Sequence, residues 1–316
     1  MIKITRDILT SLRRLGGIRD SVRRLGIVKL LDSGVREIWL RCGMRVLGSG
    51  KFEGGQRYGL WEAFLFPACD YWVRYAFVIG ALAEIKLVGP VRLLEVSSGR
   101  GGIAWFLRES NFRVCLVDSV PELLQDSRGG KAWRVCADAA RLPFTDGSFD
   151  VVVSVDTFEH IPKEHRPAFT SELKRITKNA VILTCPLDSE DGDFRAHEYD
   201  SRLLRDINRR HAAIPDWLQD HMDKGHPSPE ELSHSFPEAQ IRGTQNGDEW
   251  LEYAKRHQHF LGWLTASIYY RDAIQHLNPS PPYCRGVLLW KKPLGATTID
   301  PVSTPVGVES YENIAT

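Results

Sequence analysis

The sequence predicts an α/β fold, with a doubly wound, mostly parallel sheet of seven strands covered by helices on both faces. Two observations predict it. Short apolar runs rich in valine and leucine recur along the middle of the chain, and helical segments separate them. Parallel strands need such crossover helices, and strands buried on both faces appear as nearly continuous apolar runs. We also expect a helical extension before this domain and a helical insert inside it.

The expected strands follow one another at intervals that leave room for a helix or a long loop. The expected strands are residues 91–96, 112–118, 133–138, 149–156, 179–186, 239–246 and 284–292. The sixth has the weakest pattern, and the seventh, "CRGVLLWKK", is strongly apolar. In such a sheet, a ligand binds beyond the carboxyl ends of the strands, near the point where the strand order reverses.

The expected helices have mixed apolar and polar faces. An aromatic-rich helical segment, residues 60–86, leads into the first strand, and shorter helices follow the first, second and fourth strands. The polar, histidine-rich insert of residues 187–236 is expected to be a helical lid that contributes to substrate binding. A long helix is expected over residues 249–276, where most of the aromatic side chains are expected to belong to the core.

Composition excludes several classes of protein. The chain has 316 residues, of which 43% are hydrophobic and 26% charged, as is usual for globular proteins. Its six cysteines are scattered without a C-x-x-C pair, which favours reduced thiols in a cytoplasmic protein. Because the sequence contains no run of about 18 apolar residues, we expect no transmembrane span. The N-terminus lacks the apolar core of a signal peptide.

Charge divides the chain into an arm and a body. Residues 1–50 hold 11 Lys and Arg against 4 Asp and Glu, whereas the remainder holds 30 against 36. We expect a basic helical arm over 1–50, a catalytic domain over 51–295 and a disordered tail over 296–316. The arm either packs an apolar face on the domain or, through residues 1–45, contacts an anionic membrane or an acidic substrate.

The stretch "LLEVSSGRGGIAWFL", residues 93–107, joins a strand to a helix through a glycine-rich loop. Gly99 and Gly101 allow a ligand to approach the backbone closely. Ser97 stands where many nucleotide-binding loops have their first glycine. Gly99-x-Gly101-x-x-Ala104 also matches the dinucleotide-binding fingerprint, so an NAD-type oxidoreductase is an alternative.

Four carboxylates close four successive strands and are expected to meet at one edge of the sheet. They are Glu95, Asp118, Asp138 and Asp156. Asp118 lies where an acid accepts from ribose hydroxyls. Asp138 suits an exocyclic amine such as adenine N6, and Glu95 suits an ammonium group. A ligand with an ammonium group, a ribose and an adenine uses all three, whereas a pyrophosphate gains little from an acidic rim.

Three segments carry a family resemblance: "LLEVSSGRGG", "VCLVDSVPELL", and "CADAARLPFTDGSFDVVVSVDTFEHIP" with the sequence that continues to "ILTCP". Over residues 91–186 the chain resembles class I S-adenosylmethionine-dependent methyltransferases. It most resembles the type 11 branch, with motifs G-D-A-x-x-L-P-F, F-D-x-V and L-E-H-I. The resemblance implies a Rossmann-like fold and S-adenosylmethionine as the cofactor.

The resemblance also implies roles for individual residues. Those implied in cofactor binding are Glu95, Ser97, Gly99 and Gly101 at the aminocarboxypropyl group, Asp118 at the ribose, Ser119 or Val120 at the adenine face, Asp138 and Ala139 at its edge, and Val155 and Asp156 beneath the sulfonium. The segment "DYWVRYAFVIGALAEI" resembles a helix of methyltransferases associated with glycan assembly. That likeness implies that Arg74 and Tyr75 bind the carboxylate of the cofactor.

Methyl transfer is an in-line displacement, and a hydroxyl acceptor also needs a base. His160, after the fourth strand, is the first catalytic candidate, although it could only brace its loop. Asp156 is the second, as a base or a pocket wall. His197 and Tyr199 in "FRAHEYD" are candidate acceptor contacts, with His197 also a catalytic candidate. His226 is a further candidate in the lid. The insert's five histidines show no metal-ligand spacing, so no metal is expected.

The predicted function is therefore transfer of a methyl group from S-adenosylmethionine to an oxygen of a small-molecule or glycan- or lipid-linked acceptor. Nucleic acid is not expected as the acceptor, because residues 51–316 are net acidic and contain no N-P-P-Y or D-P-P-Y motif. The alternatives are the NAD-type oxidoreductase and a binding protein that holds S-adenosylmethionine without turnover. The substitution at Ser97 makes the second alternative conceivable.

Overall fold

A computed structural model describes six stretches of the chain: residues 68–85, 87–99, 102–107, 110–125, 132–257 and 280–293. The expected basic arm, the C-terminal tail, Gly101 and all of residues 258–279, with their aromatic side chains, lie outside the described residues. Predictions about them stay predictions.

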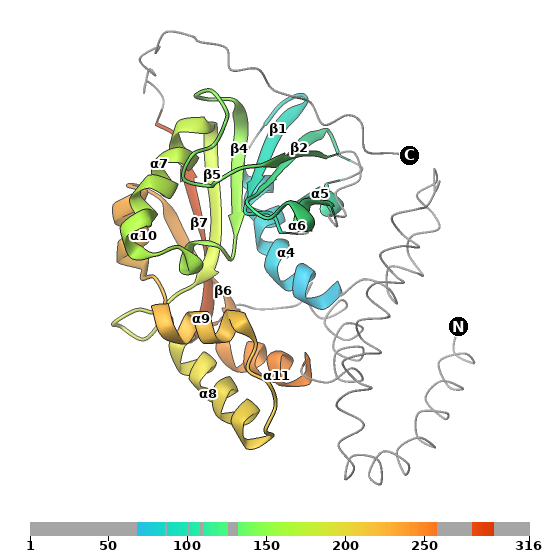
Figure 1. Ribbon diagram of the computed structural model, residues 1–316. Coiled ribbons are helices and arrows are strands. Elements are labelled where there is room, and N and C mark those ends of the chain that lie inside the picture. The colour runs from blue at the N-terminus through green and yellow to red at the C-terminus, as the bar shows by residue number, and fades with distance from the viewer. Residues whose placement is uncertain are drawn as a thin grey trace, which may run out of the picture.

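The centre of the molecule is a seven-stranded sheet with the order β3-β2-β1-β4-β5-β7-β6 (Figure 1). The strands are β1 (Val91–Val96), β2 (Phe112–Asp118), β3 (Trp133–Cys136), β4 (Phe149–Val155), β5 (Thr177–Pro186), β6 (Gln240–Asn246) and β7 (Tyr283–Lys291). The first five are parallel, and β7 pairs antiparallel with both β5 and β6. The order reverses between β1 and β4, which places a ligand site at their carboxyl ends.

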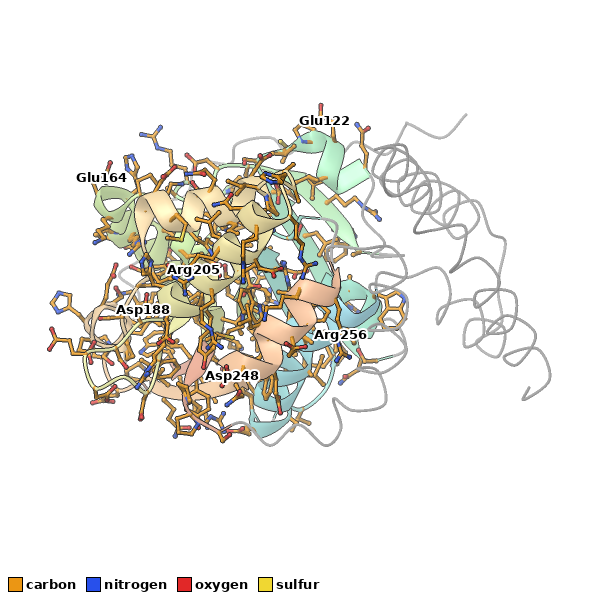
Figure 2. The ribbon with its side chains drawn as sticks, turned by 90° about the horizontal axis from the view of Figure 1, so that it is seen from below. Glu122, Glu164, Asp188, Arg205, Asp248 and Arg256 are labelled. Atoms are coloured by element: carbon orange, nitrogen blue, oxygen red, sulfur yellow. The ribbon has the colours of Figure 1, made fainter. Side chains whose placement is uncertain are left out.

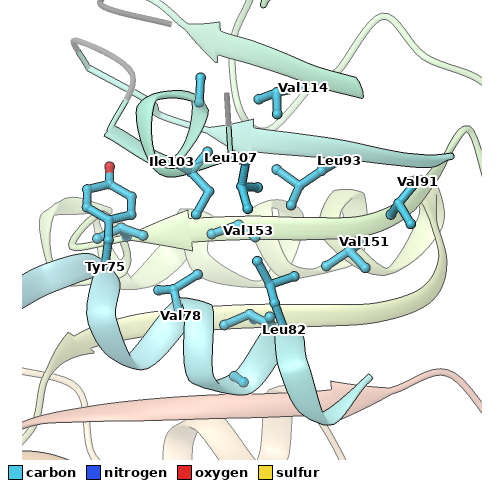
Figure 3. Packing of buried hydrophobic residues seen from close by; sticks show 14 of the residues in the cluster. Tyr75, Val78, Leu82, Val91, Leu93, Ile103, Leu107, Val114, Val151 and Val153 are labelled. Atoms are coloured by element: carbon cyan, nitrogen blue, oxygen red, sulfur yellow. The ribbon is translucent and has the colours of Figure 1, made fainter. Parts of the chain in front are cut away.

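Helices cover both faces of the sheet, as the continuous apolar strands require. On one face lie α4 (Ala68–Glu84), α5 (Gly102–Phe106) and α6 (Pro121–Gln125). Val78 and Leu82 of α4 pack there against the strands, near Leu93 and Val153 (Figure 3). On the other face, α7 (Arg166–Ile176) and α10 (Pro229–Ser235) contribute side chains to a second apolar cluster.

Most of the insert lies beyond the carboxyl ends of the parallel strands, and this part is called the lid (Figure 1). Its helices α8 (Ala196–Arg209) and α9 (Asp216–Lys224) share a third apolar cluster with α11 (Gly247–His257). Arg205 of α8 and Asp248 and Arg256 of α11 are exposed; Figure 2, seen from below, shows these lid helices with their side chains. Two short 3-10 helices, η1 (Phe158–His160) and η2 (Lys163–His165), join β4 to α7.

The predicted α/β fold is confirmed, and each predicted strand is observed within a few residues of its expected bounds. The sheet is mostly parallel, as expected, with its two late strands antiparallel. None of the helices that the structure describes is both long and apolar enough to span a membrane.

Candidate functional site

A cavity of about 330 Å³ opens at the carboxyl ends of the strands on either side of the reversal in strand order. This cofactor cavity is lined by the ends of β2 and by the segments after β1, β3 and β4. The lining residues are Ser97, Val117, Ser119, Ala137, Asp138, Ala139, Ala140, Thr157, His160, Ile161, Pro162, His165 and Phe169. The volume falls in the range of small-molecule sites, about 300–1,000 Å³.

Asp118 ends β2 and is held in a fixed orientation. Its Oδ2 accepts a hydrogen bond from the Gly99 backbone N–H at 2.8 Å, and its Oδ1 accepts from the Val120 N–H at 2.9 Å. Each carboxylate oxygen keeps a further acceptor position. Asp118 therefore couples the glycine-rich loop to β2 and retains the capacity to accept from two ribose hydroxyls.

Ser97 lines the cofactor cavity in a conformation that favours glycine. Its φ is +54°, in the left-handed region, which costs a residue with a Cβ about 1–2 kcal/mol. The tight turn after β1 is thus formed in spite of the serine, and the loop still closes onto Asp118. The departure from glycine places strain beside the cavity without changing the path of the backbone.

The far end of the cofactor cavity suits a flat polar ring. Asp138 is exposed, and its Oδ1 accepts from the Ala140 N–H at 2.8 Å, which fixes the carboxylate beside Ala139. Ser119, exposed at the end of β2, lines the same cavity. An oriented acid with small neighbours fits an adenine amino group, so the residues present fit the implied cofactor.

Glu95 lies beneath the loop rather than in either cavity described here. It is 1% exposed, and accepts hydrogen bonds from the Tyr75 hydroxyl at 2.6 Å and from the Ile103 N–H at 3.3 Å. Burial raises the pKa of Glu95 to about 8, although both hydrogen bonds oppose the rise. In this position Glu95 ties α4 and the start of α5 to β1, and supports the loop from behind.

A second cavity of about 460 Å³ separates the sheet from the lid. The residues lining this lid cavity are Val73, Arg74, Asp156, Glu159, His160, Pro186, Ala196, Asp200, Pro215, Trp217, His221, Trp250, Tyr253, Ala254, Cys284 and Arg285. Three of them are aromatic side chains from α9 and α11. Of the residues lining the two cavities, only His160 belongs to both.

Asp156, directly after β4, is the acidic corner of the lid cavity. Its φ is +49°, and its side chain is 6% exposed. Its Oδ2 lies 2.8 Å from a terminal nitrogen of Arg285 and 3.2 Å from Nε of Arg74. Two arginines therefore hold Asp156 as a structural anion, and Arg74 lies on the lid side of the site.

His160 is oriented by the lid. Its Nδ1 lies 2.6 Å from Oδ2 of Asp220 in α9, and its backbone carbonyl accepts from Nζ of Lys224 at 2.8 Å. With Asp220 accepting from Nδ1–H, the lone pair of His160 is on Nε2. Burial lowers the pKa of His160, although the hydrogen bond with Asp220 acts in the opposite direction. The lowered pKa favours a neutral ring.

Glu159 is a buried carboxyl group beside His160. It is 1% exposed, and its Oε1 lies 3.9 Å from Nε2 of His160. Burial, and then the nearby Asp156 carboxylate, raise the pKa of Glu159 well above its usual range. Its Oε2 has no hydrogen-bond partner among the described residues.

Behind His160, two lid histidines share one acid. Asp200 of α8 is buried, and its Oδ2 lies 2.8 Å from Nδ1 of His221 and 2.9 Å from Nε2 of His226. The ring of His221 lies 5.0 Å from that of His160, centre to centre. The side chain of His226 is fully buried, and His226 does not line the lid cavity.

The remaining predicted site residues lie elsewhere. His197 is exposed and lines a separate, open depression beside Asp188, so the structure does not bring it together with His160 and Asp156. Tyr199 is 2% exposed and packs in the core between α8 and α11. Val155 is a buried core residue of β4.

Sequence reasoning missed several residues of the lid cavity. Asp200 and His221 come from the insert and Arg285 comes from β7, while Asp220, also from the insert, contacts the cavity residue His160. Each meets its partner over a long sequence separation, such as the 60 residues between His160 and Asp220. The only indication in the sequence was the high density of histidines and acids in the insert. That density does not show which histidine contacts which acid.

Comparison with known proteins agrees with this geometry. Residues 94–185 match the model of a family described as a methyltransferase domain. The chain is 32% identical over 120 residues to the uncharacterized protein Rv1405c of Mycobacterium tuberculosis and, equally, to Mb1440c of Mycobacterium bovis. That alignment covers 34% of this chain and 43% of each relative, so the chain spans less than half the length of the curated relatives that it matches.

Among solved structures, the chain is similar to an S-adenosylmethionine-dependent methyltransferase from Archaeoglobus fulgidus. The identity is 16% and the TM-score 0.41, covering 69% of this chain and 92% of that one. The match to residues 94–185 includes the turn after β1, Asp118, Asp138 and His160. These residues lie in the stretch that matches a methyltransferase domain, and S-adenosylmethionine is its cofactor.

Proposed function

We propose that this chain methylates a hydroxyl group of a small, ring-containing acceptor, such as a sugar or a glycan- or lipid-linked sugar, bound in the lid cavity. The observation that carries the proposal is that the cofactor cavity and the lid cavity meet at His160. A donor in one cavity and an acceptor in the other would face each other across this side chain. An in-line displacement needs that arrangement.

In the cofactor cavity, Asp118 would hold the ribose, Asp138 the adenine amino group, and Ser97 and Gly99 the turn at the methionine end. When bound, S-adenosylmethionine supplies a methyl group on a sulfonium: an acceptor oxygen forms the new C–O bond while the C–S bond breaks and its electron pair stays on sulfur. The lid side chains exclude water from this point, because hydrolysis would compete with transfer.

His160 is the proposed catalytic residue, because it lies where the acceptor meets the donor. Its Nε2 lone pair can take the proton of the acceptor hydroxyl, or can bind a metal ion that lowers the pKa of that hydroxyl. In both cases Asp220 keeps Nδ1 protonated and the ring fixed. Asp156 acts as the ion-paired wall of the site, and His197, on the other depression, is retained only as a candidate contact for a longer acceptor.

The lid cavity supports a ring-shaped acceptor over a flexible chain. Trp217 and Trp250 lie with their ring centres 6.5 Å apart and nearly perpendicular, and Tyr253 lines the same cavity. Aromatic faces of this kind stack on the apolar face of a sugar or another ring. Glu159 and Asp200 supply polar groups that could bind its hydroxyls.

Calorimetry with S-adenosylmethionine and NAD tests the cofactor half of the proposal. We expect S-adenosylmethionine to bind and NAD not to bind, and Asp118→Ala to abolish binding. Glu122→Gln, which removes an exposed acid on α6 just after Asp118, is the matched control and should bind as the wild type does. NAD binding without S-adenosylmethionine binding would overturn the proposal.

Transfer assays with methyl-labelled S-adenosylmethionine and a panel of hydroxylated sugars and lipid-linked sugars test the acceptor half. We expect label in an acid- and base-stable ether product, lost in His160→Ala with S-adenosylmethionine binding retained. Label in an amine or ester would refute O-methylation. Cofactor binding without transfer to any acceptor in the panel would favour the alternative of a binding protein without turnover.

Residues 1–45 are proposed to contact anionic membranes, on the strength of their charge alone. Co-sedimentation with liposomes containing phosphatidylserine should recover the full chain, and a chain lacking residues 1–45 should stay in the supernatant. Equal behaviour of the two proteins would exclude this role.

A further inference from the structure

A group of three potential metal ligands lies in the wall of the lid cavity: Glu159 and His160 after β4, and His221 on α9. One ligand atom from each lies within 4.8 Å of one ligand atom from each of the others. All three line the cavity, and Glu159 and His221 are buried. Two imidazoles and one carboxylate are the ligand set of many catalytic zinc and non-haem iron sites.

Both histidines are held in the way that metal-bound histidines are held. Asp220 accepts from Nδ1 of His160 at 2.6 Å, and Asp200 accepts from Nδ1 of His221 at 2.8 Å. The Nε2 lone pairs are thereby the ones available to an ion. A carboxylate behind each ligating histidine fixes the tautomer and raises the basicity of the ring.

Two polar atoms of this group are buried without a hydrogen-bond partner among the described residues. They are Oε2 of Glu159 and Nε2 of His221. A buried polar atom that lacks a hydrogen-bond partner destabilises the folded state. A cation at this point would bind both atoms, which an acceptor hydroxyl alone could not do.

Charge around the group also calls for a cation. Within the part of the chain that the structure describes, neither Glu159 nor Asp200 is within ion-pair distance of a lysine or arginine, although both are buried. The nearby arginines are paired with Asp156 and the nearby Lys224 with Asp220. Among the described residues, no lysine or arginine therefore competes with a divalent ion for the carboxylate of Glu159.

We propose that Glu159, His160 and His221 bind a divalent transition-metal ion with the ligand preferences of Zn²⁺, and that the acceptor hydroxyl occupies its open position. The role in catalysis rests on the proposed function: the ion would lower the pKa of the bound hydroxyl, whose proton would pass to solvent before the lid side chains exclude water. Ligand atoms of a tetrahedral zinc site are about 3.4 Å apart, given Zn–N and Zn–O distances near 2.0–2.1 Å. Binding therefore contracts the group by up to about 1.4 Å.

The test uses the full chain, freed of metal with EDTA and titrated with Zn²⁺ by calorimetry and with Co²⁺ by visible absorption. We expect one ion per chain, with cobalt ligand-field bands typical of nitrogen and oxygen ligands. Glu159→Gln keeps the shape of the side chain and should weaken binding by at least about 100-fold. His234→Ala, which removes an exposed histidine of the same insert, should bind as the wild type does.

Thermal unfolding provides a readout that a purely structural role would not give. Glu159→Gln should leave the Tm of the metal-free protein close to that of the wild type, because it keeps the shape of the side chain. It should also abolish the rise in Tm that Zn²⁺ causes in the wild type. A structural acid would instead show a lower Tm in this variant and no effect of the metal.

Three outcomes would overturn the inference. The first is the absence of stoichiometric Zn²⁺ or Co²⁺ binding to a wild-type protein that binds S-adenosylmethionine, which leaves the proposed function intact. The second is unchanged binding in Glu159→Gln together with loss in His226→Gln, which would move the ion to Asp200, His221 and His226. The third is equal loss in His234→Ala, which would indicate surface binding. Failure of the proposed function itself would appear separately, as absent cofactor binding in metal-free protein.

Discussion

Glu95 should make the stability of this protein fall as pH rises from about 4.5 to about 8. Burial raises the pKa of its carboxyl group to about 8, whereas in the unfolded chain the pKa stays near 4.5. Between these values the folded protein keeps a proton that the unfolded chain has lost. Rising pH therefore favours unfolding. The stability that comes from keeping Glu95 protonated in the folded protein is fully present below about pH 4.5 and is lost by about pH 8.

The size of the effect follows from the difference between the two pKa values. Each whole pKa unit is worth 1.36 kcal/mol, so a rise of about 3.5 corresponds to about 5 kcal/mol as an upper figure. Glu95→Gln removes the titrating group and keeps an acceptor for the Tyr75 hydroxyl. The difference in unfolding free energy between wild type and variant should therefore change by several kcal/mol across this range, in favour of the variant at high pH.

Urea unfolding of the cofactor-free proteins at pH 5, 6, 7 and 8, followed by circular dichroism, measures that difference. Other titrating groups contribute equally to both proteins and cancel. Tyr75→Phe removes a hydrogen bond that lowers the pKa of Glu95, so in this variant the fall should extend to higher pH. A difference between wild type and Glu95→Gln that varies by less than about 1 kcal/mol from pH 5 to 8 would refute the reasoning.

Three further substitutions test the packing around the site. In Gly247→Ala the new Cβ would lie 1.8 Å from the ring of the buried Tyr199, so α8 and α11 must separate; we expect a loss of about 2–3 kcal/mol in chemical denaturation, and an unchanged Tm would contradict the close packing. Ser97→Gly relieves the positive φ and should stabilise the protein by up to about 1 kcal/mol; destabilisation would show that the serine hydroxyl is needed in the loop. Arg285→Met leaves the buried Asp156 with Arg74 as its remaining ion-pair partner, and should cost about 3 kcal/mol; a neutral effect in urea unfolding would show that the second arginine suffices.

The sheet was predictable because its information is local. Apolar runs such as "VRLLEV" and "FDVVVSVD" need no distant partner to be identified as strands, and β1 and β4 follow them closely. The acids that end these strands were predictable for the same reason: parallel strands bring Asp118 and Asp138 to one edge of the sheet. The left-handed backbone of Ser97 was not predictable, because a serine carries no local preference for it.

The lid cavity was not predictable, because its chemistry arises from tertiary contacts. His221 is one of five histidines in the insert, and nothing in its neighbourhood distinguishes it from the exposed His234. Only the packing of α9 against η1 brings His221 to His160 and Glu159. Tyr199 was predicted to contact an acceptor, yet it is buried in the lid core. The sequence that follows a strand does not show which face of the next helix other elements will cover.

Because Asp220 orients His160, the position of α9 affects both entry into the lid cavity and the orientation of this histidine. Asp220 and Lys224 belong to α9, so the lid holds both the ring and the backbone carbonyl of His160. Arg166, itself buried, similarly ties the carbonyl of Ile161 to Glu231 on α10. In the proposed function, a displacement of α9 that admits an acceptor would also release His160 from Asp220. If His160 acts as proposed, a methyl donor bound while α9 is displaced would have no oriented base or metal ligand beside it, and transfer would begin only after α9 returns.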